Sequence, residues 1–393
     1  MTSPRRRPAS AGLALAGLAL AGLAACGGRS AATVHSPAPT TSVSTSATPT
    51  LTPTVTPTVT PTATGSPLPP GFAAVSVTAI DDVHAWVLGS VPCGAHTCVA
   101  VGATSDGGRT FTEVPSPAAA LGVAVPGDAS GPPPAPTMTT VTDVRFSNPA
   151  DGWAYGGALF STTDGGQHWT PIAMPGLVVR VETAKDRVWA LIRTAPDTYE
   201  LRETRVGFDD WHVVTLPVAI RGAAPDLVLQ GSTVWLTTLV PGTGSRIVTS
   251  DNLGATWKLI ADPCSADLGG ELSFGPHAVW AACPTGTQGQ VLYTGDRAAP
   301  FGATALTELP NTVLVGAVDD HDAVVAAGGT LFRTADDGAT FTAVHGSGSP
   351  SAGAWRFLGF TDASVGYAVQ AGPTATLWRT ADGGRTWTAI AFG

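Results

Sequence analysis

The segment Thr380-Ala381-Asp382-Gly383-Gly384-Arg385-Thr386-Trp387 carries a pattern that much of the chain repeats. A Thr lies two residues before an Asp, a Gly two residues after it and an aromatic residue five after it. The other regular copies are Thr104, Asp106, Gly108 and Phe111; Thr162, Asp164, Gly166 and Trp169; and Thr334, Asp336, Gly338 and Phe341. The next copy is interpreted as Thr249, Asp251, Gly254 and Trp257, with one extra residue before its Gly. Two degenerate copies are Thr294, Asp296 and Phe301, and Thr204 and Trp211 with Val206 in the Asp position.

The aromatic residues of these seven copies set the repeat length. They are separated by 58, 42, 46, 44, 40 and 46 residues. A period in the forties indicates one supersecondary unit per repeat, with neighbouring units stacked over a shared core. Each unit has an apolar strand, a strand with Trp or Tyr, a third strand that ends at the pattern and a fourth that its aromatic begins. The sequence therefore predicts an all-β, seven-bladed β-propeller of four-stranded antiparallel blades over residues 72–393.

The order of the strands also predicts how the ring closes. Each blade is contiguous in sequence, so no strand is exchanged between the termini, and closure relies on packing of Phe357, Phe360 and Val75. The alternative is eight blades, with the insertion at 115–137 as a degraded repeat. That insertion is rich in proline and lacks strand alternation, which argues against an eighth blade.

The chemistry of the repeated pattern is that of a turn. Asp accepts hydrogen bonds from the N–H groups that follow it, and Gly supplies positive φ. The pattern resembles the Asp box, or bacterial neuraminidase repeat, of sialidase-like propellers. The run Asp151-Gly152-Trp153-Ala154-Tyr155-Gly156 is similar to propellers of photosystem II stability and assembly factors. The resemblance implies that the Asp boxes are structural and lie away from the ligand-binding face.

Other recurrent residues also favour structural roles. The second-strand aromatics are predicted to pack in the core, and they are Trp86, Trp153, Trp189, Trp235, Trp280 and Tyr367. In the sixth blade Val324 and Val325 replace them. The acidic runs 81–84 and 319–322 are interpreted as solvated loops on the same face as the boxes. Calcium binding there is a minor alternative, since EF-hand spacing is absent.

The amino terminus has the features of an exported lipoprotein. Residues 1–25 have a basic start and a short apolar run, as a signal peptide does. Leu23-Ala24-Ala25-Cys26 resembles a lipobox, which implies that Cys26 is acylated and anchors the protein outside the cytoplasmic membrane or on the cell surface. An ordinary secretory signal is the alternative, and the export route is open. Residues 26–71 are rich in Thr and Pro, which predicts a disordered linker.

The remaining cysteines are even in number, as expected in an oxidising compartment. We expect disulfides Cys93–Cys98 and Cys264–Cys283, both on the face opposite the boxes. A metal site that includes His96 is the competing interpretation, and zinc-ligand spacing is lacking.

Charge and motif content limit the function. Charged residues make up 12% of the chain and the net charge is −9, which argues against nucleic acid as a partner. No cofactor or metal motif is present in the sequence. A sialidase needs three arginines, a Tyr nucleophile with a Glu partner and an Asp acid/base. Arg180, Arg193 and Arg356 are expected to converge only by chance, and Tyr199 and Glu200 point to opposite faces of a strand.

We therefore expect a monomeric, non-catalytic envelope lipoprotein whose propeller binds or assembles a protein or glycan. The alternative is an exo-sialidase-like glycoside hydrolase that acts on envelope or host glycans. A cluster of arginines and carboxylates in the central face would distinguish the two, and the sequence shows none at recognisable spacing.

Overall fold

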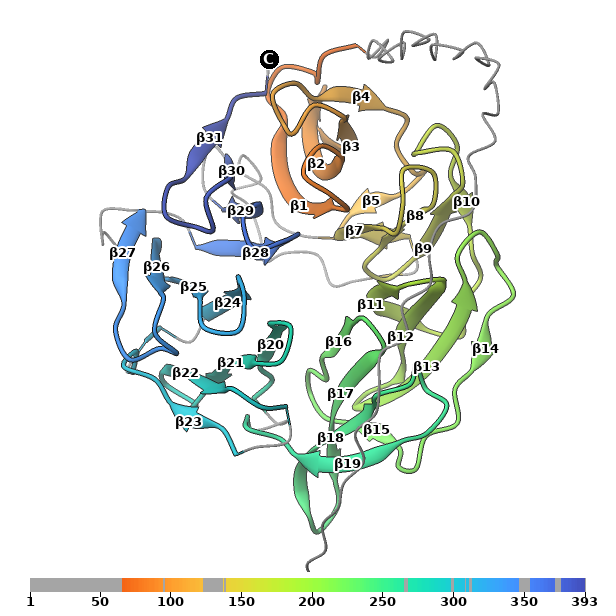
Figure 1. Ribbon diagram of the computed structural model, residues 1–393. Helices are drawn as coiled ribbons and strands as arrows, with labels where there is room; N and C mark the ends of the chain where they lie inside the picture. Colours follow the sequence, from red (N-terminus) through yellow and green to blue (C-terminus); the bar gives the residue numbers. More distant parts are fainter. Residues whose placement is uncertain are drawn as a thin grey trace, which may run out of the picture. The chain divides into compact units, whose positions relative to one another are not determined.

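A computed structural model describes residues 66–94, 96–122, 137, 139–264, 268–297, 300–307, 309–310, 313–345, 354–371 and 376–392. Seven antiparallel sheets are arranged in a ring, as predicted (Figure 1). The predicted signal peptide, Cys26 and most of the predicted linker lie outside the described residues. Within the described ranges there is no helix long and apolar enough to span a membrane.

Each sheet is one blade, and its strands follow in sequence order from the centre of the ring to the rim. Blades 1 to 3 consist of β1 (Ala73–Ala79), β2 (Ala85–Cys93), β3 (His96–Thr104) and β4 (Thr112–Val114); β7 (Asp143–Phe146), β8 (Gly152–Tyr155), β9 (Leu159–Thr162) and β10 (Thr170–Pro171); and β11 (Leu177–Ala184), β12 (Arg187–Ala195), β13 (Thr198–Arg205), β14 (His212–Val213) and β15 (Ile220–Arg221).

Blades 4 to 7 consist of β16 (Leu227–Gln230), β17 (Thr233–Val240), β18 (Gly244–Ser250) and β19 (Lys258–Ala261); β20 (Glu271–Phe274), β21 (Val279–Pro284), β22 (Gly289–Thr294) and β23 (Gly302–Ala303); β24 (Val313–Ala317), β25 (Ala323–Ala327), β26 (Thr330–Thr334) and β27 (Thr342–His345); and β28 (Trp355–Phe360), β29 (Gly366–Gln370), β30 (Thr376–Thr380) and β31 (Thr388–Ile390). Blade 3 departs from four strands because β14 and β15 both pair with β13, at its two ends.

The hydrophobic core lies between the blades. Seven clusters of buried side chains each join two neighbouring blades, one cluster for each interface of the ring. The six predicted second-strand aromatics are at most 4% exposed, which confirms their place in the core. Trp86, for example, stacks on Phe146 of the next blade with ring centroids 3.9 Å apart. Burying one such side chain contributes roughly 1.5–3 kcal/mol, so the ring is held mainly by contacts between blades.

Four turns of the repeated pattern, here called Asp turns, have the same hydrogen bonds. In blade 7, Thr380 Oγ1 donates to Asp382 Oδ1 (2.8 Å) and accepts from the N–H of Gly384 (3.0 Å). Asp382 also accepts from the N–H and hydroxyl of Thr386 (2.9 and 2.6 Å). The equivalent bonds form at Asp106 and Asp336, and at Asp164 the imidazole of His168 takes the place of the Thr hydroxyl.

The glycine of an Asp turn is required for two reasons. Gly384 has φ of 79°, a conformation that favours glycine. A Cβ at this position would also lie 2.4 Å from Val324 of the preceding blade. The turn therefore both closes its own hairpin and packs on the neighbouring blade.

The predicted Asp turn of blade 4 is wrong by one residue. Ser250 Oγ donates to Asn252 Oδ1 (2.9 Å), and Gly254 N–H donates to Ser250 Oγ (2.8 Å). Ser250 and Asn252 therefore take the places that we gave to Thr249 and Asp251, and no extra residue is present. The conservative exchange of Thr for Ser and of Asp for Asn hid the register. Thr249 Oγ1 is buried without a partner among the described residues, and Asp251 pairs with Lys258.

The two degenerate copies use other groups. In blade 3, Thr204 Oγ1 donates to the carboxylate of Asp210 (2.9 Å), which compensates for Val206. In blade 5, Thr294 Oγ1 donates to the backbone carbonyl of Asp296 (2.7 Å) rather than to its side chain. Phe301 still packs at the core between blades 4 and 5. These copies keep the hairpin but not the full bonding pattern.

A second repeat, which the sequence interpretation missed, forms the loop between the first and second strands. In four blades an Asp or Asn lies four residues before the second strand and accepts the N–H groups two and three residues later. These residues are Asp81, Asn148, Asp319 and Asp362. The acidic runs 81–84 and 319–322 are therefore turn-forming segments. They are partly exposed loops on the turn face, as predicted, but their interpretation missed that Asp81 and Asp319 cap the turns.

The ring closes without strand exchange, as predicted, because β28 to β31 form blade 7 alone. Three aromatic rings meet at this seam between blades 7 and 1. Phe392 lies with its ring centroid 4.8 Å from that of Phe72 and 5.5 Å from that of Phe111. Side-chain packing, rather than a β-ladder, therefore joins the two ends of the ring.

The residues predicted to pack at the seam are only partly right. Phe357 does pack there. Phe360 instead faces the other side of blade 7, where its ring centroid lies 6.1 Å from that of Trp387 in the core with blade 6. Val75 is the extra residue of an irregularity in β1.

The segment before the first blade belongs to the propeller. Leu68 is 3% exposed and packs in the seam cluster, and Pro67 forms a bridge with Thr112. The carbonyl of Ser66 accepts the N–H of Glu113 (2.7 Å). The fold of blade 1 thus begins a few residues before the predicted boundary at residue 72.

Two further segments lie on the face opposite the Asp turns. The disulfides Cys93–Cys98 and Cys264–Cys283 are both formed, with the predicted pairing. In the insertion between blades 1 and 2, β5 (Ala120–Leu121) pairs in parallel with β6 (Thr140–Val141). The remainder of the insertion lies mostly outside the described residues.

Candidate functional site

The candidate site is the centre of the ring, where the innermost strands meet (Figure 1). In an antiparallel blade, the first and third loops share one end, the turn face, with the Asp turns. The second loops and the links between blades share the opposite face. Three innermost strands carry one extra residue near the opposite face: Val75 in β1, Val179 in β11 and Arg356 in β28. Such bulges redirect side chains, and here they bring Val179 and Arg356 to the wall of a cavity.

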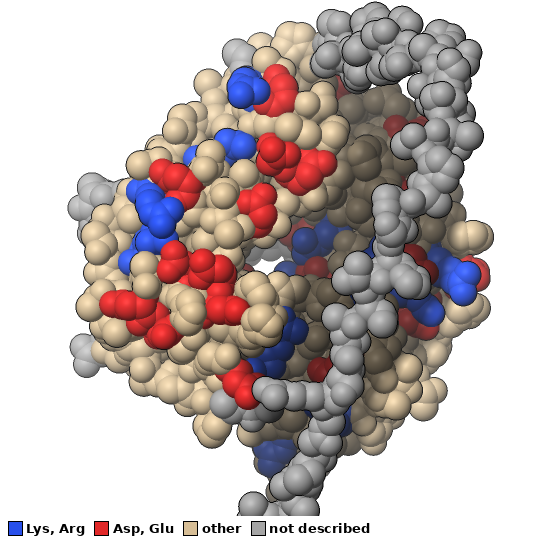
Figure 2. Space-filling view, viewed as in Figure 1, with Lys and Arg blue, Asp and Glu red and all other residues tan. Residues whose placement is uncertain are grey.

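A chain of charged side chains crosses three blades at the centre. Arg145 of β7 lies 2.5 Å from Glu182 of β11, and Arg180 of β11 lies 3.8 Å from the same carboxylate. Arg180 is also hydrogen-bonded to Asp226, which immediately precedes β16. Figure 2 shows side chains of both charge signs in the wall of the central opening. The two buried carboxylates, Glu182 and Asp226, are therefore paired with partly exposed arginines, as burial of a charge requires.

Carboxylates at the centre also join neighbouring blades through the backbone. Asp226 Oδ2 accepts the N–H of Leu272 in blade 5 (3.4 Å). Glu271 Oε2 accepts the N–H of Val315 in blade 6 (3.2 Å). Part of the polar content of the centre thus holds the innermost strands together.

A cavity of about 500 Å³, here called the mouth cavity, opens at the opposite face and is lined by residues of blades 3, 5, 6 and 7 and of the link before blade 4. Its charged and hydroxyl-bearing lining residues are Arg180, Arg193, Tyr199, Asp226, Glu271 and Arg356. Gly270 also lines it, and a Cβ there would lie 2.7 Å from Cys264 Sγ, so the second disulfide supports this wall. A smaller space of about 400 Å³ continues along the channel and shares Arg180, Glu271 and Arg356 with it.

The electrostatics of the mouth cavity favour an anionic ligand. Burial, reinforced by the charge of Asp226, raises the pKa of Glu271 to about 8, so this carboxyl is mainly protonated at neutral pH. Arg180 and Asp226 neutralise one another. Arg193 and Arg356 keep their charge, since guanidinium groups do not lose their proton in proteins. The lining is therefore net positive at neutral pH although the whole chain is acidic.

The expectation that Arg180, Arg193 and Arg356 would not converge was wrong. All three line the mouth cavity, together with the carboxylates of Asp226 and Glu271. No sequence spacing revealed this, because the residues come from blades 3 and 7 and meet only when the ring closes. The available signal was weaker: charged residues interrupt innermost strands that are otherwise apolar.

The mouth cavity does not contain an activated nucleophile. The hydroxyl of Tyr199 donates to the carbonyl of Ala223 (3.2 Å), and burial raises its pKa above the ordinary value. An attacking phenolate requires the opposite shift. The neighbouring Glu200 is hydrogen-bonded to Arg202 (2.5 Å) rather than to Tyr199. This arrangement suits binding better than covalent catalysis.

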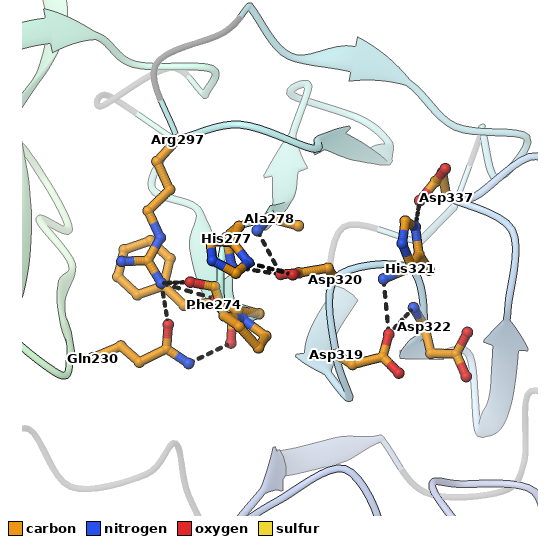
Figure 3. Close-up of polar contacts among 12 residues, drawn as sticks. Gln230, Phe274, His277, Ala278, Arg297, Asp319, Asp320, His321, Asp322 and Asp337 are labelled. Carbon is orange, nitrogen blue, oxygen red and sulfur yellow. Dashed lines mark hydrogen bonds and ion pairs between the residues drawn. The ribbon is translucent and has the colours of Figure 1, made fainter. Parts of the chain in front are cut away.

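The turn face is occupied by contacts between blades, as Figure 3 shows for blades 4 to 6. Arg297 lies over the ring of Phe274, 4.8 Å from its centroid, and is hydrogen-bonded to Gln230. Asp320 accepts the N–H of His277 (2.5 Å) and its side chain also contacts the imidazole (2.7 Å). Within the described ranges, no three metal-ligating side chains gather at one place. The polar groups here connect one blade to the next.

Comparisons with known proteins bear on the fold. No family model matches the sequence, and no curated protein matches it. A solved structure described as YCF48 bound to D1 peptide is 18% identical, with 80% of this chain and 93% of that chain covered and a TM-score of 0.53. YCF48 from Cyanidioschyzon merolae is 16% identical, with 80% and 97% covered and a TM-score of 0.53.

A third match is the β-propeller domain of the Trilobed protease from Pyrococcus furiosus, described as having an open velcro topology. It is 7% identical, covers 81% of this chain and 98% of that chain, and has a TM-score of 0.50. Identities this low show the fold alone. The chain is thus a seven-bladed β-propeller, similar in fold to YCF48.

Proposed function

We propose that this protein is a non-catalytic binding or assembly scaffold whose mouth cavity holds a peptide segment of an envelope protein. The observation that carries the proposal is the convergence of Arg193 and Arg356 beside a neutral Glu271 in a cavity of about 500 Å³. Val313 and Leu314 add apolar surface to the same wall. A cavity with apolar walls and a few oriented polar groups is the usual form of a ligand site. YCF48, which shares the fold, has been solved bound to a D1 peptide, and this supports a peptide ligand over a glycan.

Attachment to the membrane completes the proposed role. The lipobox-like Leu23-Ala24-Ala25-Cys26 supports acylation of Cys26 and a place outside the cytoplasmic membrane, with the Thr/Pro-rich linker as spacer. A single acyl chain anchors only marginally, so a diacylglyceryl group is implied. Cys26→Ala is expected to abolish lipid labelling, and a labelled variant retained in the membrane would contradict the anchor.

Site-specific crosslinking in native cells tests the scaffold. Ala224 is exposed and lines the mouth cavity, whereas Ala339 is exposed in the Asp turn of blade 6. Each alanine is replaced in turn by a photoreactive phenylalanine, and crosslinked proteins are identified by mass spectrometry. We expect a discrete partner from Ala224 and none from Ala339. A partner captured only from Ala339 would place binding on the turn face and contradict the proposal.

The glycoside hydrolase remains the second candidate because three arginines, Tyr199 and two carboxyls do share one cavity. The raised pKa of Tyr199 opposes it. A fluorogenic sialoside incubated with the purified chain is expected to give no hydrolysis above background. Turnover that disappears in Arg356→Gln would establish the enzyme and displace the scaffold.

A further inference from the structure

Two arginines occupy the same place in successive repeats. Arg333 in β26 and Arg379 in β30 each directly precede the Thr of their Asp turn. Both extend toward the Asp turn of the next blade around the ring, blade 7 for Arg333 and blade 1 for Arg379. Their partners can therefore be compared one by one.

Arg333 is fully paired. Its guanidinium forms an ion pair with Asp322, three residues after the Asp that caps the first loop of the same blade. Its Nε donates to the carbonyl of Gly383 in the next Asp turn (2.8 Å). The two charged side chains are only 11% and 15% exposed, so they shield one another from water. This contact joins blade 6 to blade 7.

Arg379 lacks both of those partners. Val365 takes the position that corresponds to Asp322, and it offers no acceptor. The Nε of Arg379 is buried without a hydrogen bond to any described residue. Its Nη2 reaches the carbonyl of Asp82 at 3.4 Å, beyond the usual length of such a bond. Its guanidinium lies over the ring of Tyr367 in its own blade, 5.9 Å from the ring centroid. Among the described residues, this cation at the seam therefore has no carboxylate partner.

A groove of about 580 Å³ opens over this arginine on the turn face, and Arg379 lines it between blades 7 and 1. Arg109 lines the groove as well, and its guanidinium donates to the backbone carbonyl of Asp106 (3.0 Å). The acidic lining residue is Asp382, whose two oxygens already accept the bonds of its own turn. The groove therefore presents a net positive lining.

We propose that this seam groove binds a carboxylate-bearing ligand, which does for Arg379 what the Asp322 side chain does for Arg333. A planar guanidinium matches a carboxylate through paired N–H bonds. Because the groove is lined from both blades, an occupied groove fixes blade 7 against blade 1. Binding at the seam is then coupled to the stability of the closed ring, since a ligand that binds only the folded state raises its melting temperature.

The test is thermal unfolding of the full chain at constant ionic strength in chloride, sulfate, succinate or a capped Glu-rich peptide. The wild-type Tm is expected to rise in succinate or in the peptide by more than the general rise that sulfate, an excluded salt, produces. A response to succinate identifies a small free acid, whereas a response to the peptide alone identifies an acidic segment of a partner.

Matched variants locate the effect. Arg379→Met should raise the carboxylate concentration needed for a given rise in Tm roughly tenfold or more, because hydrogen bonds between charged groups are lost. Arg333→Met should lower the Tm in every buffer yet keep the response, and Arg385→Met, in the same Asp turn, serves as an exposed control should Arg333→Met not fold. An undiminished response in Arg379→Met, or a rise in the wild type no larger than that in sulfate, would each overturn the proposal.

Discussion

The turn face of this ring consists of loops that repeat from blade to blade, whereas the opposite face carries features found only in particular blades. On the turn face, Asp turns and first loops repeat from blade to blade, and their carboxylates bind the backbone that follows them. On the opposite face, the disulfides, the bulges and the mouth cavity each occur in particular blades. Repetition on one face forms a scaffold, and departures from it on the other form a site. The seam groove shows that a departure from the repeat can also form a site on the turn face, because it lies where the partners of Arg379 differ from those of Arg333.

The largest effect is expected from a deletion that opens the ring, because both faces depend on ring closure. Deletion of the last eight residues removes β31 and Phe392 and leaves the edge of β30 bare. We expect aggregation on size-exclusion chromatography with light scattering, since an open strand edge pairs with other chains. Removal of Gly393 alone should leave a soluble monomer. A soluble six-bladed monomer after the longer deletion would show that blade 7 is dispensable.

Removing the disulfides alters only the opposite face. Replacement of either cysteine pair by serine should lower the free energy of unfolding by on the order of 2–3 kcal/mol, with the larger loss for the wider Cys264–Cys283 loop. Loss of Cys264–Cys283 should also weaken binding at the mouth cavity, because Gly270 packs on Cys264. The variant that lacks Cys93–Cys98 is the control. If both variants lose partner binding equally, the Cys264–Cys283 disulfide has no specific role at the mouth cavity. Denaturant unfolding and partner binding give the two measurements.

Single substitutions in the Asp turns sharpen the comparison on the turn face. Asp382→Ala should cost about 1–3 kcal/mol, because several N–H and hydroxyl donors lose their acceptor. In blade 4, Asn252→Ala should be comparably destabilising and Asp251→Ala nearly neutral, as Asp251 has only an exposed ion pair. Thermal melting would measure all three. A larger loss of stability in Asp251→Ala than in Asn252→Ala would favour the original assignment of Thr249 and Asp251 to this turn. Loss of partner binding at an unchanged Tm would show that the Asp turns form a binding site.

The two faces are also expected to differ in how their stabilisation depends on pH. Hydrogen bonds lower the pKa of Asp382 in spite of some burial, and that of Asp164 to about 2, so their stabilisation is lost as the pH falls through these values. The raised pKa of Glu271, about 8, acts oppositely: its stabilisation is complete below the unfolded pKa of 4.5 and is lost as the pH rises through 8.

Melting curves from pH 5 to pH 9 measure the second effect in isolation. Relative to Glu271→Gln, which keeps an acceptor for Val315 and cannot ionise, wild type should lose stability progressively from pH 5 to about pH 8 and no further above it. Parallel curves for the two proteins would show that Glu271 does not titrate in this range.

Much of the scaffold was predictable because it depends on local spacing. Blade number, strand order, the buried aromatics and both disulfides follow from residues that recur in phase or lie close in sequence. The errors arose where chemistry was conserved but identity was not, as at Ser250 and Asn252. The Asx turns at Asp81 and its equivalents were visible as a fixed distance to the second strand, and were overlooked because Asn148 breaks the acidic pattern.

The candidate site could not be predicted in the same way. The mouth cavity unites Arg193 of blade 3 with Glu271 of blade 5 and Arg356 of blade 7. Such a site depends on the diameter of the ring and on bulges that shift side chains by one residue, and no period in the sequence encodes either. The importance of Val365 likewise becomes clear only when the structure shows that Asp322, at the corresponding position, pairs with Arg333.

The unbroken strand order has a consequence for how such a chain can be rearranged. Because every blade is encoded by one continuous stretch, a cut between two blades divides no blade, and Phe72 and Phe392 lie close enough in space to be bridged by a short connector. A circularly permuted gene could then begin at any of seven places on the rim and still encode the same set of blades. If the chain is anchored at Cys26 as proposed, the anchor would move with that starting point, and the choice of first residue would set which way the mouth cavity faces relative to the membrane.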